Sequence, residues 1–293
     1  MRNSECGIER PSRSARTRSR GWEFALLLLL LVACQSGPFG RSRVVALSGE
    51  QERKLGAEAY QQVLADERDK VLPADAPLAQ RVAEVGGRLA RASDDPAFRA
   101  AAGLKGSQRF DWDFRVVDEP TVNAFCLPGG KVVVYTGIAP VCRTDAGLAV
   151  VLGHEVSHAL GRHGAERLTQ QQLATAGAKA AEAGLGTTGL GTTAQAGVLR
   201  AINAGERFGL LAYSRRHESE ADRMGLLLAA AAGYDPGEAA GFWERMARAS
   251  GGKQGPVFLS THPAHGTRIA DLRRYEPDAR KLLRDPQPDR PLP

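Results

Sequence analysis

The chain has 293 residues, of which 43% are hydrophobic and 25% are charged, and its formal net charge is +6 at pH 7. Removing the first 33 residues would remove six arginines and three glutamates, so the net charge would fall to +3. No basic patch with interleaved aromatic residues is present, which excludes nucleic-acid binding as the expected function. The remaining length suits one domain with a small sheet and surrounding helices.

The N-terminus has the features of a targeting segment. Six arginines lie within the first twenty residues, and residues 24–33 form a leucine-rich apolar run. That run is about half of the roughly twenty residues that a bilayer-spanning helix needs. A basic start, a short apolar stretch and a small residue at its end predict a secretory signal peptide over residues 1–33.

The apolar run ends in Leu31-Val32-Ala33-Cys34, which resembles the lipobox of bacterial lipoproteins. In that interpretation Cys34 is lipidated and becomes the new N-terminus, and the following Gln35 favours sorting to the outer membrane. We then expect a periplasmic protein that its lipid anchors to the outer membrane without a membrane span. The alternative is an ordinary signal cleavage near Ala33, with Cys34 incidental.

Next come a short linker and a single domain. Glycine and proline residues predict the linker over residues 34–48, and the domain follows over residues 49–280. Two helices are predicted at its start, over residues 50–67 and 76–92, and the second has apolar residues at helical spacing.

A small sheet is predicted after these helices. Residues 110–117 alternate between apolar and polar side chains, which is typical of a strand. Residues 122–127 and 131–135 are two further strand-like runs, separated by the turn sequence Pro-Gly-Gly.

Residues 154–158 read His-Glu-Val-Ser-His. Histidines four positions apart on a helix project from the same face, so His154 and His158 can bind one zinc ion. Glu155 is then placed to hold and deprotonate a water molecule. Apolar flanks predict a helix over residues 145–163, in which polar groups need partners. The competing interpretation is an ordinary helix with two solvated histidines.

Zinc peptidases with this motif differ in their third ligand. One class uses a third histidine after a glycine turn, but His163 comes one residue early and we interpret it as a surface or packing histidine. The other class uses a glutamate from a second helix. Glu218 and Asp222 share one face of a helix predicted over residues 214–232. Glu218 is predicted to be the third ligand, Asp222 to accept a hydrogen bond from a ligating histidine, and Glu220 to be solvated.

The remaining segments are less distinctive. Residues 174–197 are rich in Ala, Gly and Thr, and form either a mobile loop or a weak helical hairpin. Helices are expected over residues 236–249 and 266–275, and a disordered Pro-rich tail over residues 281–293.

Two cysteines besides Cys34 follow the predicted signal peptide. Cys126 and Cys142 could pair in an oxidising compartment. Cys126 falls in an apolar strand, where a buried thiol is expected.

Four motifs occur in a fixed order along residues 110–275. They are residues 122–138 (Val-Asn-Ala-Phe-Cys-Leu-Pro-Gly-Gly-Lys-Val-Val-Val-Tyr-Thr-Gly-Ile), 154–158, 218–222 (Glu-Ser-Glu-Ala-Asp) and 260–268 (Ser-Thr-His-Pro-Ala-His-Gly-Thr-Arg). Together they resemble the HtpX and CAAX-prenyl-protease type of zinc metallopeptidases, a gluzincin family. The branch resembled most is that of the periplasmic BepA- and LoiP-like lipoprotein proteases and the mitochondrial overlapping-activity protease. The resemblance implies an α+β fold, a mostly helical zincin-like domain with a small sheet beside the active-site helix.

The resemblance also implies roles for single residues. Residues 122–138 correspond to a strand pair beside the active-site cleft, so Asn123, Ala124 and Phe125 are expected to bind substrate. An extended substrate can add to such a strand through backbone hydrogen bonds. His262 corresponds to a residue that can become a fourth zinc ligand, displace water and keep the enzyme latent. The alternative is a histidine that simply precedes the next helix.

The expected function is zinc-dependent endopeptidase activity with one zinc ion per chain and Glu155 as general base. A further donor to the oxyanion is expected from His217, Arg268 or Tyr213. The expected partners are unfolded or misassembled envelope proteins, as substrates in quality control, and no nucleic acid. The competing function is a zinc-stabilised periplasmic chaperone or assembly factor with little proteolysis. An intact Glu155 argues against it, because a structural zinc site needs no base.

Overall fold

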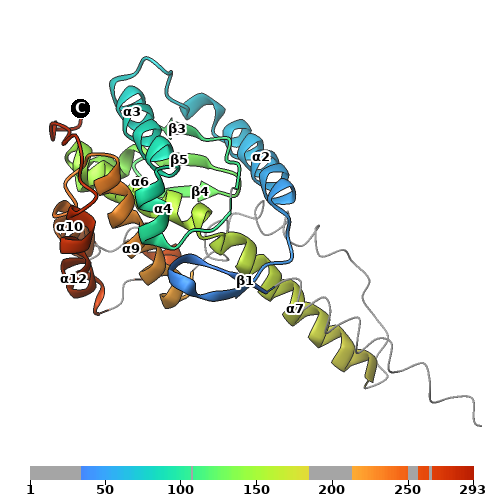
Figure 1. Cartoon of the computed structure of the whole chain (residues 1–293). Helices are drawn as coiled ribbons and strands as arrows, with labels where there is room; N and C mark the ends of the chain where they lie inside the picture. The colour runs from blue at the N-terminus through green and yellow to red at the C-terminus, as the bar shows by residue number, and fades with distance from the viewer. Residues whose placement is uncertain (1–33, 107, 185–212, 250–256, 264–265) are drawn as a thin grey trace, which may run out of the picture.

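A small β-sheet between helices forms the centre of the fold (Figure 1). The computed structural model describes residues 34–106, 108–184, 213–249, 257–263 and 266–293. The predicted signal peptide and the second half of the Ala/Gly-rich segment lie outside the described residues. The expected α+β class, mostly helical with a small sheet, is confirmed.

The sheet has three strands, β3 (Asp113–Val117), β4 (Ala124–Leu127) and β5 (Lys131–Tyr135), in the order β3-β5-β4. β5 is parallel to β3 and antiparallel to β4. The predicted Pro-Gly-Gly turn joins β4 to β5, and its Gly129 and Gly130 have φ angles of 83° and 94°. Residues with a side chain rarely adopt such angles, so this turn depends on glycine. It leaves β4 at one edge of the sheet.

Helices cover both faces of this sheet (Figure 1). In chain order the helices are α2 (Gly49–Asp66), α3 (Pro77–Ala92), α4 (Pro96–Ala102), α5 (Ala139–Cys142), α6 (Asp145–Leu160), α7 (His163–Gly184), α9 (Arg215–Ala231), α10 (Glu238–Ala249), α11 (Val257–Thr261) and α12 (Arg268–Arg280), with short 3-10 helices η1 (Pro38–Gly40), η2 (Arg68–Lys70) and η3 (Thr136–Ile138). The sequence does not predict α4, α5 and α11, because so few residues show no helical period. None of the described helices is long and apolar enough to cross a membrane.

The two faces of β5 contact different helices, as the alternation of side chains along a strand requires. Val132 and Val134 belong to the main core, with α3, α6 and α9. Val133 and Tyr135 belong to a smaller cluster with Tyr60 of α2. The sheet is therefore the middle of three layers.

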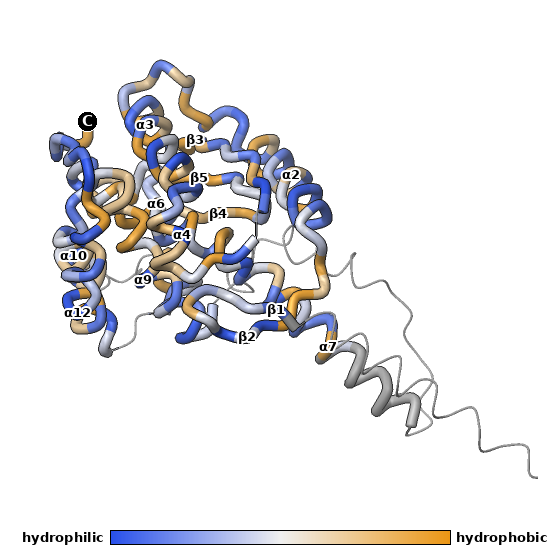
Figure 2. The backbone as a smooth tube through the Cα atoms, viewed as in Figure 1, coloured by the Kyte–Doolittle hydropathy of each residue, from blue (hydrophilic) through white to orange (hydrophobic). Residues whose placement is uncertain are grey.

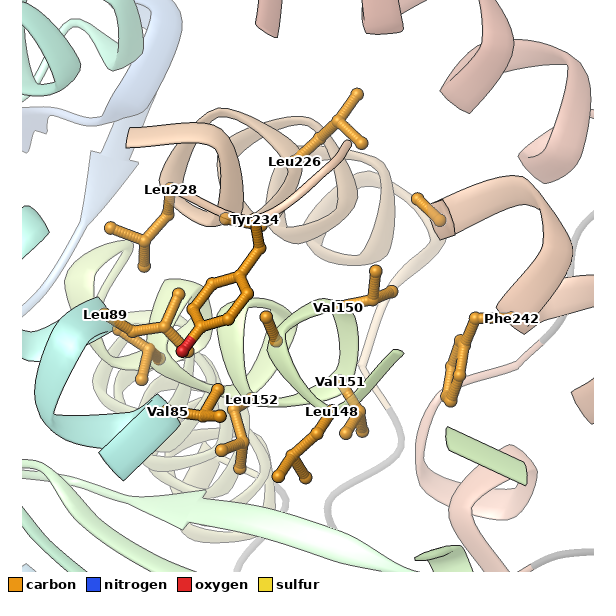
Figure 3. Close-up of a cluster of buried hydrophobic side chains, with 14 of the residues drawn as sticks. Val85, Leu89, Leu148, Val150, Val151, Leu152, Leu226, Leu228, Tyr234 and Phe242 are labelled. Atoms are coloured by element: carbon orange, nitrogen blue, oxygen red, sulfur yellow. The ribbon is translucent and has the colours of Figure 1, made fainter. Parts of the chain in front are cut away.

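α6 is the central helix, and all 16 of its residues are buried. Its Leu148, Val151 and Leu152 lie among core side chains that include Val85 and Leu89 of α3 (Figure 3). Hydrophobic residues gather along α6 and the strands of the central sheet, whereas α2 and α12 contain many hydrophilic residues (Figure 2). A helix buried on all sides can carry polar side chains where they have partners.

α6 and α9 approach closely because each has a glycine at their contact. A Cβ atom on Gly225 would lie 2.9 Å from backbone atoms of Gly153 and His154. A Cβ atom on Gly153 would lie 3.0 Å from the carbonyl oxygen of Gly225. Larger residues at these positions would push the helices apart. The glycines thus allow α9 to pack directly beside His154.

The helix that carries the His-Glu-Val-Ser-His motif ends earlier than predicted. It stops at Leu160, and α7 begins at His163 after a turn in which Arg162 has a φ of 55°. The expected continuous helix is therefore wrong. Arg162 donates hydrogen bonds to Glu52 and to the carbonyl oxygen of Leu47. These contacts with distant residues stabilise a left-handed conformation that local sequence does not favour.

Residues 34–48 form a hairpin and not the predicted linker. Strands β1 (Cys34–Ser36) and β2 (Ser42–Val44) pair antiparallel. Arg162 donates to the side-chain oxygen of Gln35 at 2.8 Å, which ties the hairpin to the turn between α6 and α7. The linker prediction fails because the contacts that hold the segment, both this polar one and the packing of Phe39 and Val45, join residues far apart in the sequence.

Residues 281–293 pack against the start of α6 and are not the predicted disordered tail. The carbonyl oxygen of Arg290 accepts from the backbone N–H of Asp145, and the Asp289 carboxylate accepts from that of Ala146. The first N–H groups of a helix lack partners within the helix. The tail supplies those partners, which is why a proline-rich sequence is ordered here.

The two cysteines of the domain are free thiols. Cys126 lies partly buried in β4, and Cys142 lies buried at the end of α5. Burial raises the pKa of both thiols. The possible disulfide between them is not formed.

Candidate metal centre

α6 and α9 bring three ligand-type side chains together. His154 and His158, one turn apart on α6, are buried, and their Nε2 atoms lie 3.1 Å apart. Glu218 is fully buried, and its two carboxylate oxygens lie 3.5 Å from these nitrogens. α9 begins just before Glu218 because the hydroxyl of Ser214 caps it, accepting from the backbone N–H of His217.

His262, directly after α11, adds a fourth donor atom. Its Nδ1 lies 3.2 Å from Nε2 of His154 and 3.1 Å from Oε1 of Glu218. One ligand atom from each of these residues and His158 lies within 4.8 Å of all the others. Ligands about 2.1 Å from a tetrahedral zinc ion are about 3.4 Å from one another. The spacing of the four donors fits such a site.

The chemistry of this cluster also fits a metal ion. His154, His158 and His262 point ring nitrogens at one another, and a neutral imidazole nitrogen that carries no hydrogen is an acceptor. Acceptors that face one another with a carboxylate in a buried space need a cation between them. Imidazole nitrogen and carboxylate oxygen are common zinc ligands. These residues would therefore hold the ion.

Asp222 and Arg268 contact two of the candidate ligands, His154 and Glu218. Nδ1 of His154 lies 2.9 Å from Oδ1 of Asp222. Nη2 of Arg268 donates to Asp222 at 2.7 Å and to Glu218 at 3.0 Å, and its guanidinium group lies over the ring of Trp243. Asp222 is therefore placed as the sequence predicts. The predicted role of Arg268 as an oxyanion donor stays a prediction, since its observed contacts hold carboxylates.

Glu155 lies beside the four donors and is held from one side. Its Oε2 accepts a hydrogen bond from the backbone N–H of Cys126 at 3.2 Å. Its Oε1 lies 3.3 Å from Nε2 of His262. Burial raises the pKa of the Glu155 carboxyl. A raised pKa brings a carboxylate closer to the value that suits a general base near neutral pH.

The local charges favour a cation at this place. Burial is the largest cause and the charge of the neighbouring His154 the second largest, and together they hold the pKa of His158 well below its usual range. This imidazole is therefore neutral. Burial would lower the pKa of His154, but Asp222 and Glu218 raise it to about 9. Burial would raise the pKa of Glu218, but His262 and His154 hold it well below its usual range. His158 and Glu218 are thus in the neutral and ionised forms that metal ligands need. The carboxylates beside His154 favour a positive charge there, which a metal ion would supply in place of a proton.

His217 makes its contacts outside the four-donor cluster, so its predicted role as an oxyanion donor stays a prediction that these contacts do not support. Its Nε2 lies 3.2 Å from a carboxylate oxygen of Glu166, and its ring stacks on that of His163. Successive residues of a helix are about 100° apart around its axis, so His217 points away from the ligand that follows it. Tyr213 instead stacks on His158, with ring centroids 3.9 Å apart.

β4 runs beside Glu155. The backbone N–H of Cys126, which donates a hydrogen bond to Glu155, points away from β5 at the edge of the sheet. Ala124 is buried and Phe125 partly buried, and Asn123 directly precedes the strand. Neither the side-chain nitrogen nor the side-chain oxygen of Asn123 has a hydrogen-bond partner within the described part of the chain. The structure thus places the predicted substrate-binding residues next to the predicted general base.

Two residues that the sequence assigns to solvent or to simple packing are buried behind the metal centre. Nδ1 of His163 lies 3.0 Å from Nδ1 of His158, on the side away from the other ligands. Glu220 is buried and pairs with Arg41 at 2.5 Å, so its expected solvation is wrong. The hairpin that carries Arg41 covers this side of α9. The sequence signal that could have indicated this burial is the position of Glu220 on a helix that is buried on several sides.

Residues 80–276 match the family described as Peptidase family M48. This match covers more than half of the chain and includes all the candidate ligands, Glu155 and Asp222. The chain belongs to peptidase family M48. Membership of the M48 family confirms both the family resemblance and the predicted class of enzyme, a metallopeptidase.

Individual M48 relatives match over much of the chain. Mitochondrial metalloendopeptidase OMA1 of Schizosaccharomyces pombe is 35% identical over 242 residues, which cover 82% of this chain and 65% of that protein. Metalloendopeptidase OMA1, mitochondrial, of Homo sapiens is 31% identical over 83% of this chain and 46% of its own length. The beta-barrel assembly-enhancing protease of Escherichia coli is 31% identical over 60% of this chain and 37% of its own length.

These relatives contradict the predicted periplasmic, outer-membrane location. Relatives from yeasts, a plant and vertebrates carry mitochondrial names. The prediction fails because an Arg- and Ser-rich start before a short apolar run is not specific to one compartment, since transit peptides share the first of these features. The lipidation predicted for Cys34 has no support from the comparisons.

Proposed function

We propose that this M48 protein is a zinc-dependent endopeptidase, with His154, His158 and Glu218 holding one zinc ion. The observation that carries the proposal is the set of buried donors at tetrahedral spacing beside a buried carboxylate, Glu155. A zinc ion in such a site supplies Lewis acidity, which polarises a peptide carbonyl and lowers the pKa of water.

The protein's own residues would move the proton. Oε1 of Glu155 lies 3.3 Å from Nε2 of His262 and has no hydrogen-bond partner among the described residues, while its Oε2 accepts from the N–H of Cys126. Oε1 can therefore take a proton from an attacking water and pass it to the leaving amine. Tyr213, which is half-buried and stacks on His158, is the candidate among the three predicted donors whose ring contacts a ligand.

The substrates we propose are unfolded or misassembled polypeptides. β4 is an edge strand of the described sheet, and an extended chain can pair with such an edge through backbone hydrogen bonds. The free amide of Asn123 lies at the start of this edge and could bind a substrate backbone. Pairing of this kind selects extended, unfolded segments more than particular sequences.

A second function is favoured by one observation. His262 supplies a fourth donor, and structural zinc sites have four protein ligands whereas catalytic ones keep an open position. The competing proposal is a zinc-stabilised chaperone or assembly factor with little proteolysis.

Casein cleavage separates the two functions. The purified protein should degrade casein, a chelator such as 1,10-phenanthroline should abolish cleavage, and added zinc should restore it, because the proposed chemistry requires the metal. Initial rates of peptide release measure this. Zinc-loaded, folded protein that leaves casein intact would favour the chaperone.

We expect His262→Leu to raise peptidase activity or self-cleavage while zinc content holds. Nδ1 of His262 lies among the ligand atoms, and its Nε2 lies 3.3 Å from Glu155, where the attacking water must sit. Leucine keeps the bulk but cannot bind metal. A tenfold rise would correspond to about 1.4 kcal/mol for displacing the imidazole. Casein turnover and metal analysis measure both quantities.

The matched control is Ser260→Ala on the same short helix, since its hydroxyl is exposed and bonds the carbonyl oxygen of Val257. This variant should behave as wild type. If His262→Leu keeps zinc but loses turnover, His262 stabilises the transition state and does not hold the enzyme latent.

A further inference from the structure

The side of His158 that faces away from the metal centre is occupied by another imidazole. Nε2 of His158 faces His154 and Glu218, so its Nδ1 points backwards, where Nδ1 of His163 lies 3.0 Å away. When Nε2 of a neutral imidazole binds a metal, its Nδ1 carries the hydrogen and must donate it. His163 is therefore the acceptor, and its own hydrogen is on Nε2.

That hydrogen on His163 points towards a carboxylate. Nε2 of His163 lies 3.7 Å from Oε1 of Glu220, and neither atom has a closer hydrogen-bond partner among the described residues. The other oxygen of Glu220 accepts from Nε of Arg41 at 2.5 Å. Polar contacts thus run from His158 through His163 and Glu220 to Arg41 of the N-terminal hairpin.

The two ligating histidines are supported in parallel ways. His154 faces the carboxylate of Asp222, which Arg268 binds. His158 faces the carboxylate of Glu220 through one inserted imidazole, and Arg41 binds that carboxylate. Partners of this kind fix the tautomer and ring orientation of a metal-binding histidine.

The chain makes specific room for the inserted imidazole. A Cβ atom on Gly161 would lie 2.4 Å from Nε2 of His163, closer than real contacts allow. The turn at Arg162 then reverses the chain, so that His163 returns over His158. His217 stacks on the other face of His163 with ring centroids 4.6 Å apart. The position of His163 is thus fixed on several sides.

This second group of polar residues is not itself a metal site. Arg41 donates two hydrogen bonds to Glu166, at 2.7 and 2.6 Å, in addition to its bond to Glu220. The guanidinium group therefore occupies the place between the two carboxylates that a cation would take. The group of residues binds an arginine of the hairpin instead.

We propose that His163, Glu220 and Arg41 position His158 for metal binding, so that the N-terminal hairpin contributes to the metal centre. This inference rests on the proposed zinc site. Because His163 touches a ligand and not the reacting atoms, it is a positioning residue. Its loss should weaken metal binding even where the apo-protein is as stable as before.

The test measures zinc affinity by competition with a chromophoric chelator, for the full chain and its variants. His163→Phe keeps a flat ring but removes the acceptor, and the dissociation constant for zinc should rise about 10- to 100-fold. His163→Gln keeps an acceptor and a donor, and should restore most of the affinity. Arg41→Met, which acts through two intermediate residues, should give a smaller rise of several-fold.

The matched control is Arg81→Met. Arg81 also binds a buried carboxylate, that of Asp145, but at the opposite end of α6. This variant should bind zinc as wild type does. Melting temperatures of the apo-proteins in EDTA show whether a variant is folded.

Each outcome decides between the hypotheses. A folded His163→Phe protein with wild-type zinc affinity overturns the positioning role. If that variant does not fold, Arg41→Met decides, since unchanged affinity overturns the proposal and weaker affinity at unchanged apo stability supports it. A wild-type protein that binds no zinc would reject the zinc site itself, and the positioning role with it.

Discussion

Glu155→Gln should lose proteolysis while zinc content and melting temperature remain those of the wild type. Glutamine has the shape of glutamate, and its amide oxygen can keep the hydrogen bond from the N–H of Cys126. Its NH₂ group, however, cannot accept a proton from water. General-base catalysis contributes about 10²- to 10⁴-fold, so casein cleavage should fall by that factor.

The control for this prediction is Glu84→Gln. Glu84 is about 42% exposed and pairs with Arg290 at the surface, so the same chemical change there should leave the cleavage rate unchanged. Near-normal casein turnover by Glu155→Gln would show that another group takes the proton. Loss of zinc from that variant would instead show that Glu155 contributes to metal binding.

The parts of the site that sequence predicts best are those fixed by one helical period. His154 and His158 share a face because they are four positions apart, and the same spacing relates Glu218 to Asp222. Local rules also predict the helices and strands around them, and β5 has its predicted bounds. Family resemblance added His262, whose distance in sequence hides its place beside the other donors.

The parts that sequence misses depend on polar contacts between distant residues. Arg41 is 125 positions from Glu166 and 179 from Glu220, so no periodic pattern links them. The hairpin therefore reads as a linker. The ordered structure of the C-terminal tail is missed for the same reason. It depends on hydrogen bonds that the tail accepts from the backbone N–H groups of Asp145 and Ala146.

Closeness in sequence to a ligand does not show whether a histidine lies at the metal centre. His217 precedes Glu218, but on a helix this neighbour points elsewhere, towards Glu166. His163 follows the motif by a few residues and lies behind His158, because the chain turns at Arg162. Whether a histidine binds the metal or supports a ligand is thus decided by the turn and not by the spacing.

Glu218→Ala should lose zinc. Its carboxylate is the proposed ligand with negative charge, and both its oxygens lie 3.5 Å from a ligating nitrogen. Changes at residues that only hydrogen-bond to ligands weaken binding about 10- to 100-fold, so removal of a ligand should exceed about 100-fold. Metal analysis after dialysis and chelator competition measure this loss. Because zinc binds the folded state, EDTA should lower the melting temperature of the wild type but not that of Glu218→Ala.

Glu155→Gln is the matched comparison for this last prediction, since both glutamates are buried beside the same imidazoles. One variant should keep zinc and lose catalysis, and the other should lose both. Arg268 keeps its bond to Asp222 in Glu218→Ala, so the variant retains a partner for that buried charge and should fold. If Glu218→Ala binds zinc as tightly as the wild type, the third ligand is wrongly assigned. His262 would then be the remaining donor near His154, and zinc loss in the double variant Glu218→Ala, His262→Leu would identify it as a ligand.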